Sequence, residues 1–236
     1  MSNVIVLKRL KDVYTYFPKR DDIRYMFSDV SLYSSADISH SLATSNILLG
    51  YYSGTQLKNK ILTDASSCIG GNTWSFSLLV KGVNAVEIDV NNYECLVNNM
   101  RGYNNIFFYR DNFFNLKDEF ESNIIFYDPP WGGINYDNNN IGYYYQNEFY
   151  GVDMLASKSL YKSIPELIMF KVPCNLDISW DDWKYCNTIK FKDNRGKDIY
   201  KIVVLSDIKG EVKEEVVVNR INYKKIKYFP VRKDYQ

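Results

Sequence analysis

Short apolar segments alternate with amphipathic ones from about residue 60 onward, and this pattern predicts buried strands joined by helices. The expected core strands are apolar runs that end in polar residues, at 61–65, 83–89, 106–110, 123–127 and 167–172. Helices are expected between the first three strands, at 73–80 and 91–101. This alternation is typical of an α/β protein with a mainly parallel, doubly wound sheet and right-handed crossovers.

The two ends of the chain follow other patterns. Apolar runs at 187–191 and 199–205 predict an antiparallel pair that closes the sheet. Near the N-terminus, Asp37 precedes a helical pattern that continues to about Gly50, which is the place of a helix cap. We therefore expect a small helical N-terminal extension at residues 1–58 and an α/β domain at residues 59–236.

Composition limits the class of protein. Hydrophobic residues make up 46% of the 236 residues, which allows a sizeable core. No apolar run approaches the roughly 20 residues of a membrane helix, and the first residues lack the pattern of a cleaved leader. We expect a soluble intracellular monomer, cytoplasmic or nuclear, without membrane contact. The abundance of Tyr, Asn, Lys and Ile is typical of an AT-rich genome, such as that of a protist or of a virus acting in a host cell.

Metal binding is not expected. The cysteines Cys68, Cys95, Cys174 and Cys186 form no C-x-x-C pair, and His40 is the single histidine. A zinc site needs a set of ligands that this chain barely has, so reduced and mostly buried thiols are the simpler interpretation.

Charge is divided unevenly along the chain. Residues 1–27 contain six basic and three acidic residues, and residues 190–236 contain thirteen and seven. The middle, residues 28–189, contains ten basic and eighteen acidic residues. Basic ends of this kind can hold a phosphate-rich partner, but they are equally typical of an ordinary solvated surface. Charge alone leaves both interpretations open.

Candidate ligand-binding groups fall at the carboxyl ends of the expected strands, where open α/β sheets bind ligands. The first strand ends in Asp64-Ala65, and a glycine turn, Gly70-Gly71-Asn72, leads into the next helix. Glycine allows close approach of a ligand to the backbone, but the dinucleotide fingerprint G-x-G-x-x-G is absent. An acid at the strand end repels a pyrophosphate and suits a cationic ligand that resembles an amino acid.

Two further acids follow the next strands. Glu87 ends the second strand, where a carboxylate can accept hydrogen bonds from ribose hydroxyls. Asp89 fits the cap of the following helix better. Asp111 follows the third strand, and its carboxylate can accept a hydrogen bond from an adenine amine or simply belong to a loop.

The most specific signal is the run Asp128-Pro129-Pro130-Trp131 at the end of a buried strand. Proline fixes φ, removes a donor and forces the preceding residue to be extended, so the turn is rigid. The carboxylate of Asp128 and the carbonyl of Pro129 can hold the two hydrogens of an amine on an aromatic ring, and Trp131 can stack on that ring. Such positioning is worth several kcal/mol of an activation barrier.

These residues resemble the trimethylguanosine synthase family. The likeness is carried by residues 64–72, Glu87-Ile88-Asp89, Arg110-Asp111 and the run Pro129-Pro130-Trp131-Gly132-Gly133. It extends over roughly residues 40–175 and includes Lys171-Val172-Pro173 on the fifth strand. The resemblance implies a class I (Rossmann-like) methyltransferase domain, with a seven-stranded mixed sheet and a helical N-terminal extension. It also implies methylation of the exocyclic N2 amine of 7-methylguanosine RNA caps by S-adenosylmethionine.

The resemblance implies roles for individual residues. Trp131 is expected to stack on 7-methylguanine, next to Asp128. Tyr136 and the run Tyr143-Tyr144-Tyr145 follow the motif, and one or two of these tyrosines are expected to close the pocket. The residues expected to contact the cofactor come from the glycine turn, the strand ends and the extension: Asp64, Ala65, Gly70, Gly71, Asn72, Glu87, Asp111 and Thr44. Two positions depart from the family, because Cys68 stands where it usually has glycine and Asp128 stands where animal members often have serine.

A methylated cap also suits the residues on physical grounds. Methylation at N7 makes guanine cationic, and a cation over an indole gains about 0.5–2 kcal/mol. Basic side chains near the N-terminus are candidates for holding the cap triphosphate: Lys8, Arg9, Lys11, Lys19, Arg20 and Arg24.

Two alternatives remain open at this point. Another base amino-methyltransferase, acting on adenine N6 or on guanine N2 of ribosomal RNA, would share the fold and the Asp-Pro-Pro motif. A non-catalytic RNA-binding protein could also retain the fold. Dependence on the N7 methyl group distinguishes the first alternative, and failure to bind S-adenosylmethionine distinguishes the second. The sequence leaves open whether one or two methyl groups are added.

Overall fold

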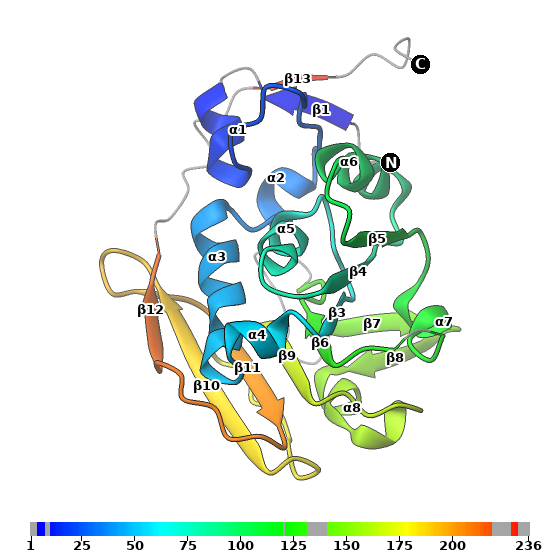
Figure 1. The fold of residues 1–236 in the computed structure, drawn as a ribbon, viewed down its shortest axis with the longest axis vertical. Coiled ribbons are helices and arrows are strands. Elements are labelled where there is room, and N and C mark those ends of the chain that lie inside the picture. The colour runs from blue at the N-terminus through cyan, green and yellow to red at the C-terminus, as the bar shows by residue number, and fades with distance from the viewer. Residues whose placement is uncertain (1–3, 8–9, 120, 132–140, 219–227, 231–236) are drawn as a thin grey trace.

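The structure is a computed structural model of the chain, and it describes all residues except 1–3, 8–9, 120, 132–140, 219–227 and 231–236 (Figure 1). Its main element is an eight-stranded sheet with the strand order β12-β10-β11-β9-β6-β3-β4-β5. The strands from β9 to β5 are parallel to one another, whereas β11 is antiparallel to both β9 and β10. The doubly wound sheet and its antiparallel closing pair are therefore confirmed.

The strands lie close to their expected positions. The parallel strands are β3 (Ile61–Asp64), β4 (Gly82–Val86), β5 (Ile106–Tyr109), β6 (Ile124–Tyr127) and β9 (Leu167–Val172). The closing pair is β10 (Tyr185–Lys192) and β11 (Asp198–Ser206). A short strand, β12 (Glu215–Val217), adds to the edge of the sheet beside β10 and brings the seven expected strands to eight.

The central strands are buried on both faces, which explains why their sequences are continuously apolar. In β6, Ile124 and Phe126 join one hydrophobic core, whereas Ile125 and Tyr127 join the other. β9 alternates in the same way between the two cores. This alternation decides which side chains meet beyond the strand ends.

Helices cover both faces of the sheet. One core includes residues of η1 (Ile47–Gly50), α4 (Gly54–Leu57) and α5 (Gly71–Ser77), and the other includes residues of α7 (Phe113–Leu116) and α8 (Val152–Ala156). A single turn, η3 (Lys158–Leu160), follows α8. α3 (Ile38–Asn46) packs beside α5 (Figure 1), and the carboxylate of Asp37 caps it by accepting from the backbone N–H of His40 at 2.9 Å.

The N-terminal extension contains strands as well as helices. β1 (Val4–Leu7) pairs with β2 (Phe27–Ser28) and with β13 (Tyr228–Pro230), so a small three-stranded sheet joins both ends of the described chain. α1 (Leu10–Tyr16) and α2 (Ser31–Ser34) complete this part. The division at residue 58 remains our proposal.

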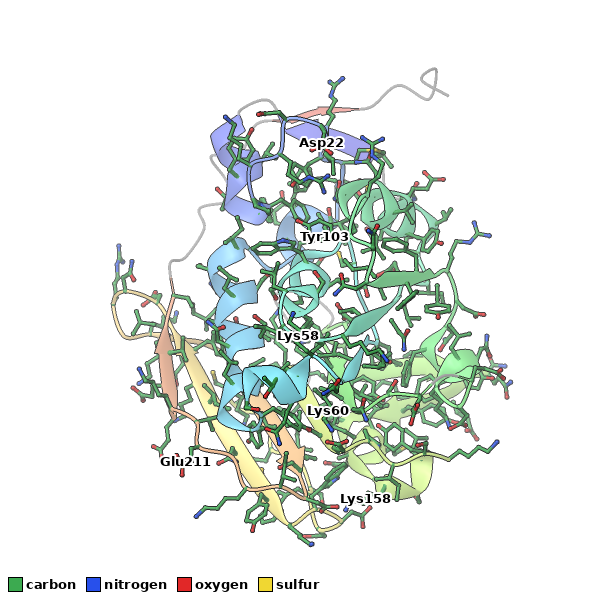
Figure 2. The ribbon with its side chains drawn as sticks, in the orientation of Figure 1. Asp22, Lys58, Lys60, Tyr103, Lys158 and Glu211 are labelled. Atoms are coloured by element: carbon green, nitrogen blue, oxygen red, sulfur yellow. The ribbon has the colours of Figure 1, made fainter. Side chains whose placement is uncertain are left out.

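The extension is joined to α6 (Val90–Asn99) and to the residues just after it. The side-chain carbonyl of Asn99 accepts from the backbone N–H of Met26 at 2.8 Å. Arg20 pairs with Asp22 and also donates to the backbone carbonyl of Arg101 at 2.7 Å. Figure 2 shows Asp22 in this region, above Tyr103.

A hairpin that the sequence pattern did not reveal lies between β6 and α8. It consists of β7 (Gly142–Tyr145) and β8 (Glu148–Gly151), joined by Gln146 and Asn147. Both turn residues have positive φ, 51° and 66°, which is the backbone of a type I′ turn. All four cysteines are free thiols, and no helix within the described ranges is long and apolar enough to cross a membrane.

Candidate active site at the carboxyl edge of the sheet

A row of charged side chains crosses four neighbouring strands at their carboxyl ends. Along the order β9-β6-β3-β4, the row runs from Lys171 to Asp128, Asp64 and Glu87. The chain proceeds from β3 towards one edge of the sheet and later returns through β6 on the other side, so β3 and β6 form the topological switch point. Open α/β sheets bind their ligands at this point, and the structure places three of the predicted acids there.

Asp64 is a buried carboxylate that lacks a full set of partners. It is 1% exposed, and its Oδ2 accepts from the hydroxyl of Thr73 at 2.6 Å. Its Oδ1 is buried without a hydrogen-bond partner among the described residues. Burial raises the pKa of Asp64 to about 7, and the nearby charge of Asp128 adds to this effect. A cationic or N–H-donating ligand would satisfy the free oxygen and favour the ionised form.

The glycine turn brings the backbone close to Asp64 and to the extension. Gly70 has a φ of 101°, a left-handed conformation that favours glycine. Gly71 opens α5, and a Cβ there would lie 2.6 Å from the backbone carbonyl oxygen of Ala36. The next residue, Asn72, has a side-chain oxygen that is buried with no partner in the described part of the chain. Asn72 therefore offers a second acceptor at the start of α5.

Cys68 has a backbone conformation that favours glycine. Its φ is 50°, in the left-handed region. The thiol lies 3.3 Å from the hydroxyl of Ser35 and 3.7 Å from that of Ser34, both in the extension. The backbone N–H of Cys68 donates to Glu87 at 2.8 Å. Cys68 therefore connects the turn to the extension through its thiol and to Glu87 through its backbone N–H.

Glu87 braces the turn from the next strand. One carboxylate oxygen accepts from Cys68 and the other accepts from the backbone N–H of Asp89 at 2.8 Å. Burial raises the pKa of Glu87, and these hydrogen bonds oppose the rise. Asp89 caps α6 by accepting from Asn91 and Asn92, the role expected for it.

The remaining predicted cofactor residues are less directly linked to this row. Ala65 is buried and donates its backbone N–H to Phe126 at 3.0 Å. Thr44 is buried on α3. The Oδ1 of Asp111 accepts from the backbone of Asn112 and from the side chain of Asn115, at 2.6 and 2.7 Å. These are local contacts of a loop acid, and they neither link Asp111 to the row nor prevent its other oxygen from binding a ligand.

Asp128 forms an ion pair that the sequence did not suggest. Lys171 donates from Nζ to Oδ2 of Asp128 at 2.6 Å, and both side chains are largely buried. Burial raises the pKa of Asp128, and the lysine opposes the rise through its charge and its hydrogen bond. A lysine inside the otherwise apolar strand Leu167–Val172 was the only signal in the sequence.

Ser66 links the glycine turn to the Asp-Pro-Pro turn. Its hydroxyl donates to the backbone carbonyl of Asp128 at 3.0 Å and lies 2.9 Å from the hydroxyl of Tyr143 on β7. Because the single serine proton is used for Asp128, Tyr143 is the donor in the second contact. Neither Ser66 nor Tyr143 was expected in this role.

The structure describes the prolines and the tryptophan of the motif, but not all of the aromatic residues expected at the substrate pocket. Pro129 is buried, Pro130 is exposed, and no described peptide bond is cis. Trp131 is half-buried and packs against both hydrophobic cores, and Nζ of Lys171 lies 5.8 Å from the centre of one of its rings. Tyr136 lies outside the described residues.

Two other predictions from the sequence concern metal binding and the binding of the cap triphosphate. Among the described residues, no group of three or more His, Cys, Asp or Glu side chains is arranged to hold a metal. Of the basic candidates for phosphate binding, Lys19 lies 3.8 Å from Asp21 and Arg20 is engaged by Asp22.

By sequence, the chain matches a family of known proteins and a viral relative. The profile of a family described as RNA cap guanine-N2 methyltransferase matches residues 59–216. Uncharacterised protein L320 of Acanthamoeba polyphaga mimivirus is 31% identical over 162 residues, which are 64% of this chain. The aligned part covers 59% of that relative's length.

Comparison of structures supports the fold. A candidate methyltransferase from Porphyromonas gingivalis W83 superposes with a TM-score of 0.56 at 12% identity, over 86% of this chain and 50% of that one. The candidate methyltransferase YhhF of Escherichia coli has a TM-score of 0.50 at 15% identity, over 78% and 93% of the two chains. The doubly wound sheet is therefore the Rossmann-like sheet of methyltransferases.

Proposed function

We propose, from the premise that this chain belongs to the RNA cap guanine-N2 methyltransferase family, that it methylates the exocyclic N2 amine of 7-methylguanosine RNA caps. S-adenosylmethionine is its cofactor, as in other methyltransferases of this fold. The proposed partner is capped RNA, and we keep the monomer as the proposed form.

One observation carries the proposal. Asp128, Pro129 and Trp131 follow β6 at the switch point, where the charge of Asp128 acts on the buried acid Asp64. An amine on a flat ring needs two acceptors for its hydrogens and a surface for the ring. The cationic ring of 7-methylguanine gains more from stacking on an indole than a neutral base gains.

The residues on the cofactor side fit S-adenosylmethionine. The free oxygens of Asp64 and Asn72 would accept from its ammonium group, and Glu87 would accept from its ribose hydroxyls. Gly70 and Gly71 keep the turn free of side chains. The bound cofactor supplies an electrophilic methyl group on a sulfonium. Ala65, Thr44 and Asp111 remain proposed contacts.

On the substrate side, Asp128 orients the amine by accepting one of its hydrogens. Deprotonation in advance is not required, because the nitrogen loses its proton readily once it carries the methyl group. Trp131 would stack on the base, and Tyr136 is proposed to close the pocket. Lys171 already occupies Oδ2 of Asp128, which leaves Oδ1 for the amine.

The test supplies labelled S-adenosylmethionine with 7-methyl-GTP, GTP and uncapped RNA in parallel. Label in 7-methyl-GTP alone is the expected result. Label in GTP or uncapped RNA would indicate that the substrate is another base amine and not the methylated cap. Failure to bind S-adenosylmethionine in calorimetry would leave a non-catalytic RNA-binding protein.

A further inference from the structure

The pairing of Asp128 with Lys171 follows from strand register. In the parallel pair β6 and β9, Tyr127 is opposite Phe170. The next residue of each strand is therefore Asp128 on one side and Lys171 on the other, and both point to the same face. Their side chains are 16% and 11% exposed, and Nζ is 2.6 Å from Oδ2.

The lysine is confined by aromatic rings. Its Nζ lies 5.1 Å from the ring centre of Tyr200 and 5.8 Å from a ring of Trp131. Tyr200 is itself fixed, because its ring stacks on Phe191 at 4.6 Å and its hydroxyl lies 2.8 Å from Nδ1 of His40 on α3. Lys171 is thus held in place from β11 and from the extension.

The charge balance at this edge depends on the lysine. Burial disfavours the ionised form of Asp128, and the acid Asp64 stands beside it. Among the described residues, the titratable groups near the pair include the acid Asp64 and the phenols Tyr143 and Tyr200, and Tyr200 in turn contacts His40. Lys171 is the basic side chain that contacts Asp128 directly.

We propose that Lys171 is a positioning residue of the methyl transfer, which holds Asp128 as a charged acceptor with Oδ1 turned to the substrate amine. This inference rests on the proposed role of Asp128 towards an exocyclic amine. A neutral Asp128 would carry a hydroxyl hydrogen, which would oppose an amine hydrogen instead of accepting it. Without the lysine, Asp128 would accept only at higher pH.

The experiment compares Lys171→Met and Lys171→Arg with the wild type from pH 6 to pH 9.5, at saturating S-adenosylmethionine. We expect Lys171→Met to lose about tenfold or more in kcat at pH 7 and to recover most of it near pH 9, since one pKa unit is a factor of ten in ionisation. Lys171→Arg should keep the wild-type profile. The charge of Asp128 also acts on the pKa of Asp64, so the profiles are read together with a direct titration of Asp128.

Two results would overturn the inference. An equal loss at every pH in a folded Lys171→Met protein would indicate a structural role. Tighter binding of 7-methyl-GTP by this variant, with an unchanged pH profile, would make the lysine a competitor of the substrate instead. If Lys171→Met does not fold, the double variant Asp128→Asn/Lys171→Met removes both charges together. That variant should then show a low rate without the acidic limb of the wild-type profile, and retention of this limb would refute the inference.

A readout without turnover separates this inference from the choice of substrate. The carboxyl ¹³C resonance of Asp128 reports its ionisation directly, and its midpoint should rise in Lys171→Met but not in Lys171→Arg. An unchanged midpoint refutes the role of Lys171 even if 7-methyl-GTP is the substrate. Methylation of another base would refute the cap proposal, and the same pH comparison would then use that base.

Discussion

Asp64 and Asp128 end the neighbouring strands β3 and β6, and the charge of Asp128 adds to the effect of burial on the pKa of Asp64, which rises to about 7. The hydroxyl of Thr73 opposes this rise by donating to the carboxylate. Two acids of equal charge are thus kept close together inside the protein. Lys171 pairs with Asp128, so the ionised form of Asp64 stays unfavourable until a cationic or N–H-donating ligand joins it.

Stability without ligand should fall as the pH rises. The pKa of Asp64 is about 7 in the folded protein and 3.8 as its ordinary value, so the folded state keeps a proton that the unfolded chain releases. The free energy of unfolding should therefore decrease between about pH 4 and pH 7, by about 4 kcal/mol from Asp64 alone. Urea unfolding of the wild type and of Asp64→Asn at several pH values measures the difference between the two slopes.

Comparison with Asp64→Asn is needed because the raised pKa values of Glu87 and Asp128 act in the same direction. Asp153→Asn, at an exposed carboxylate of α8, is the control and should keep the wild-type slope. Binding of S-adenosylmethionine near pH 6.5 should release protons, which calorimetry in two buffers detects. An Asp64→Asn protein with the same slope as the wild type would contradict the assignment.

Replacement of Trp131 should separate substrate from cofactor. Trp131→Ala removes the proposed stacking surface, and stacking of a base on an aromatic side chain is worth about 1–3 kcal/mol. We expect kcat/KM for 7-methyl-GTP to fall tenfold or more, with the affinity for S-adenosylmethionine nearly unchanged. Trp180→Ala, at a tryptophan that is 43% exposed, is the matched control and should have little effect on either value. Loss of cofactor binding in Trp131→Ala would contradict a role of the indole on the substrate side alone.

Removal of the Tyr143 hydroxyl should lower both stability and methylation rate, whereas removal of the Tyr144 hydroxyl should change neither. Tyr143 donates to Ser66, which in turn holds the backbone carbonyl of Asp128. Tyr143→Phe should lower the free energy of unfolding by about 1 kcal/mol and reduce the methylation rate several-fold by loosening the Asp-Pro-Pro turn. Tyr144→Phe, on a side chain that is 69% exposed, should match the wild type in thermal unfolding and in rate. Equal behaviour of the two variants would exclude this link.

Replacement of Cys68 by glycine should give a more stable protein than replacement by alanine. Both variants lose the thiol contact with Ser35, but only glycine adopts a φ of 50° without strain. Cys68→Gly should therefore be more stable than Cys68→Ala by about 1 kcal/mol in urea unfolding. The reverse order would show that the left-handed backbone is not strained at this position.

Much of the sheet could be predicted because its central strands are buried on both faces and form continuous apolar runs. The β7–β8 hairpin was missed because its tyrosines suggested pocket residues, and its Gln146-Asn147 turn lacks the usual glycine. The pairing of β1 with β13 joins two short segments from opposite ends of the chain. No local pattern indicates such a pairing.

The site could be predicted in part. The acids Asp64, Glu87 and Asp128 meet at one edge because parallel strands end there, and this follows from strand order alone. Lys171 was missed because its contact depends on the register between β6 and β9, which the sequence does not state. Asp111 also follows a strand, but its Oδ1 forms only local contacts and its proposed role towards the cofactor stays a prediction.

The bare backbone of Gly71 has a consequence for protein engineering. Because a single added carbon would collide with the carbonyl of Ala36, the extension and α5 fit together without any intervening side chain. A truncated enzyme that begins at β3 would expose this surface to water at the start of α5, beside Asn72. Attempts to transplant the sheet domain into another scaffold should therefore carry the segment around Ala36 with it.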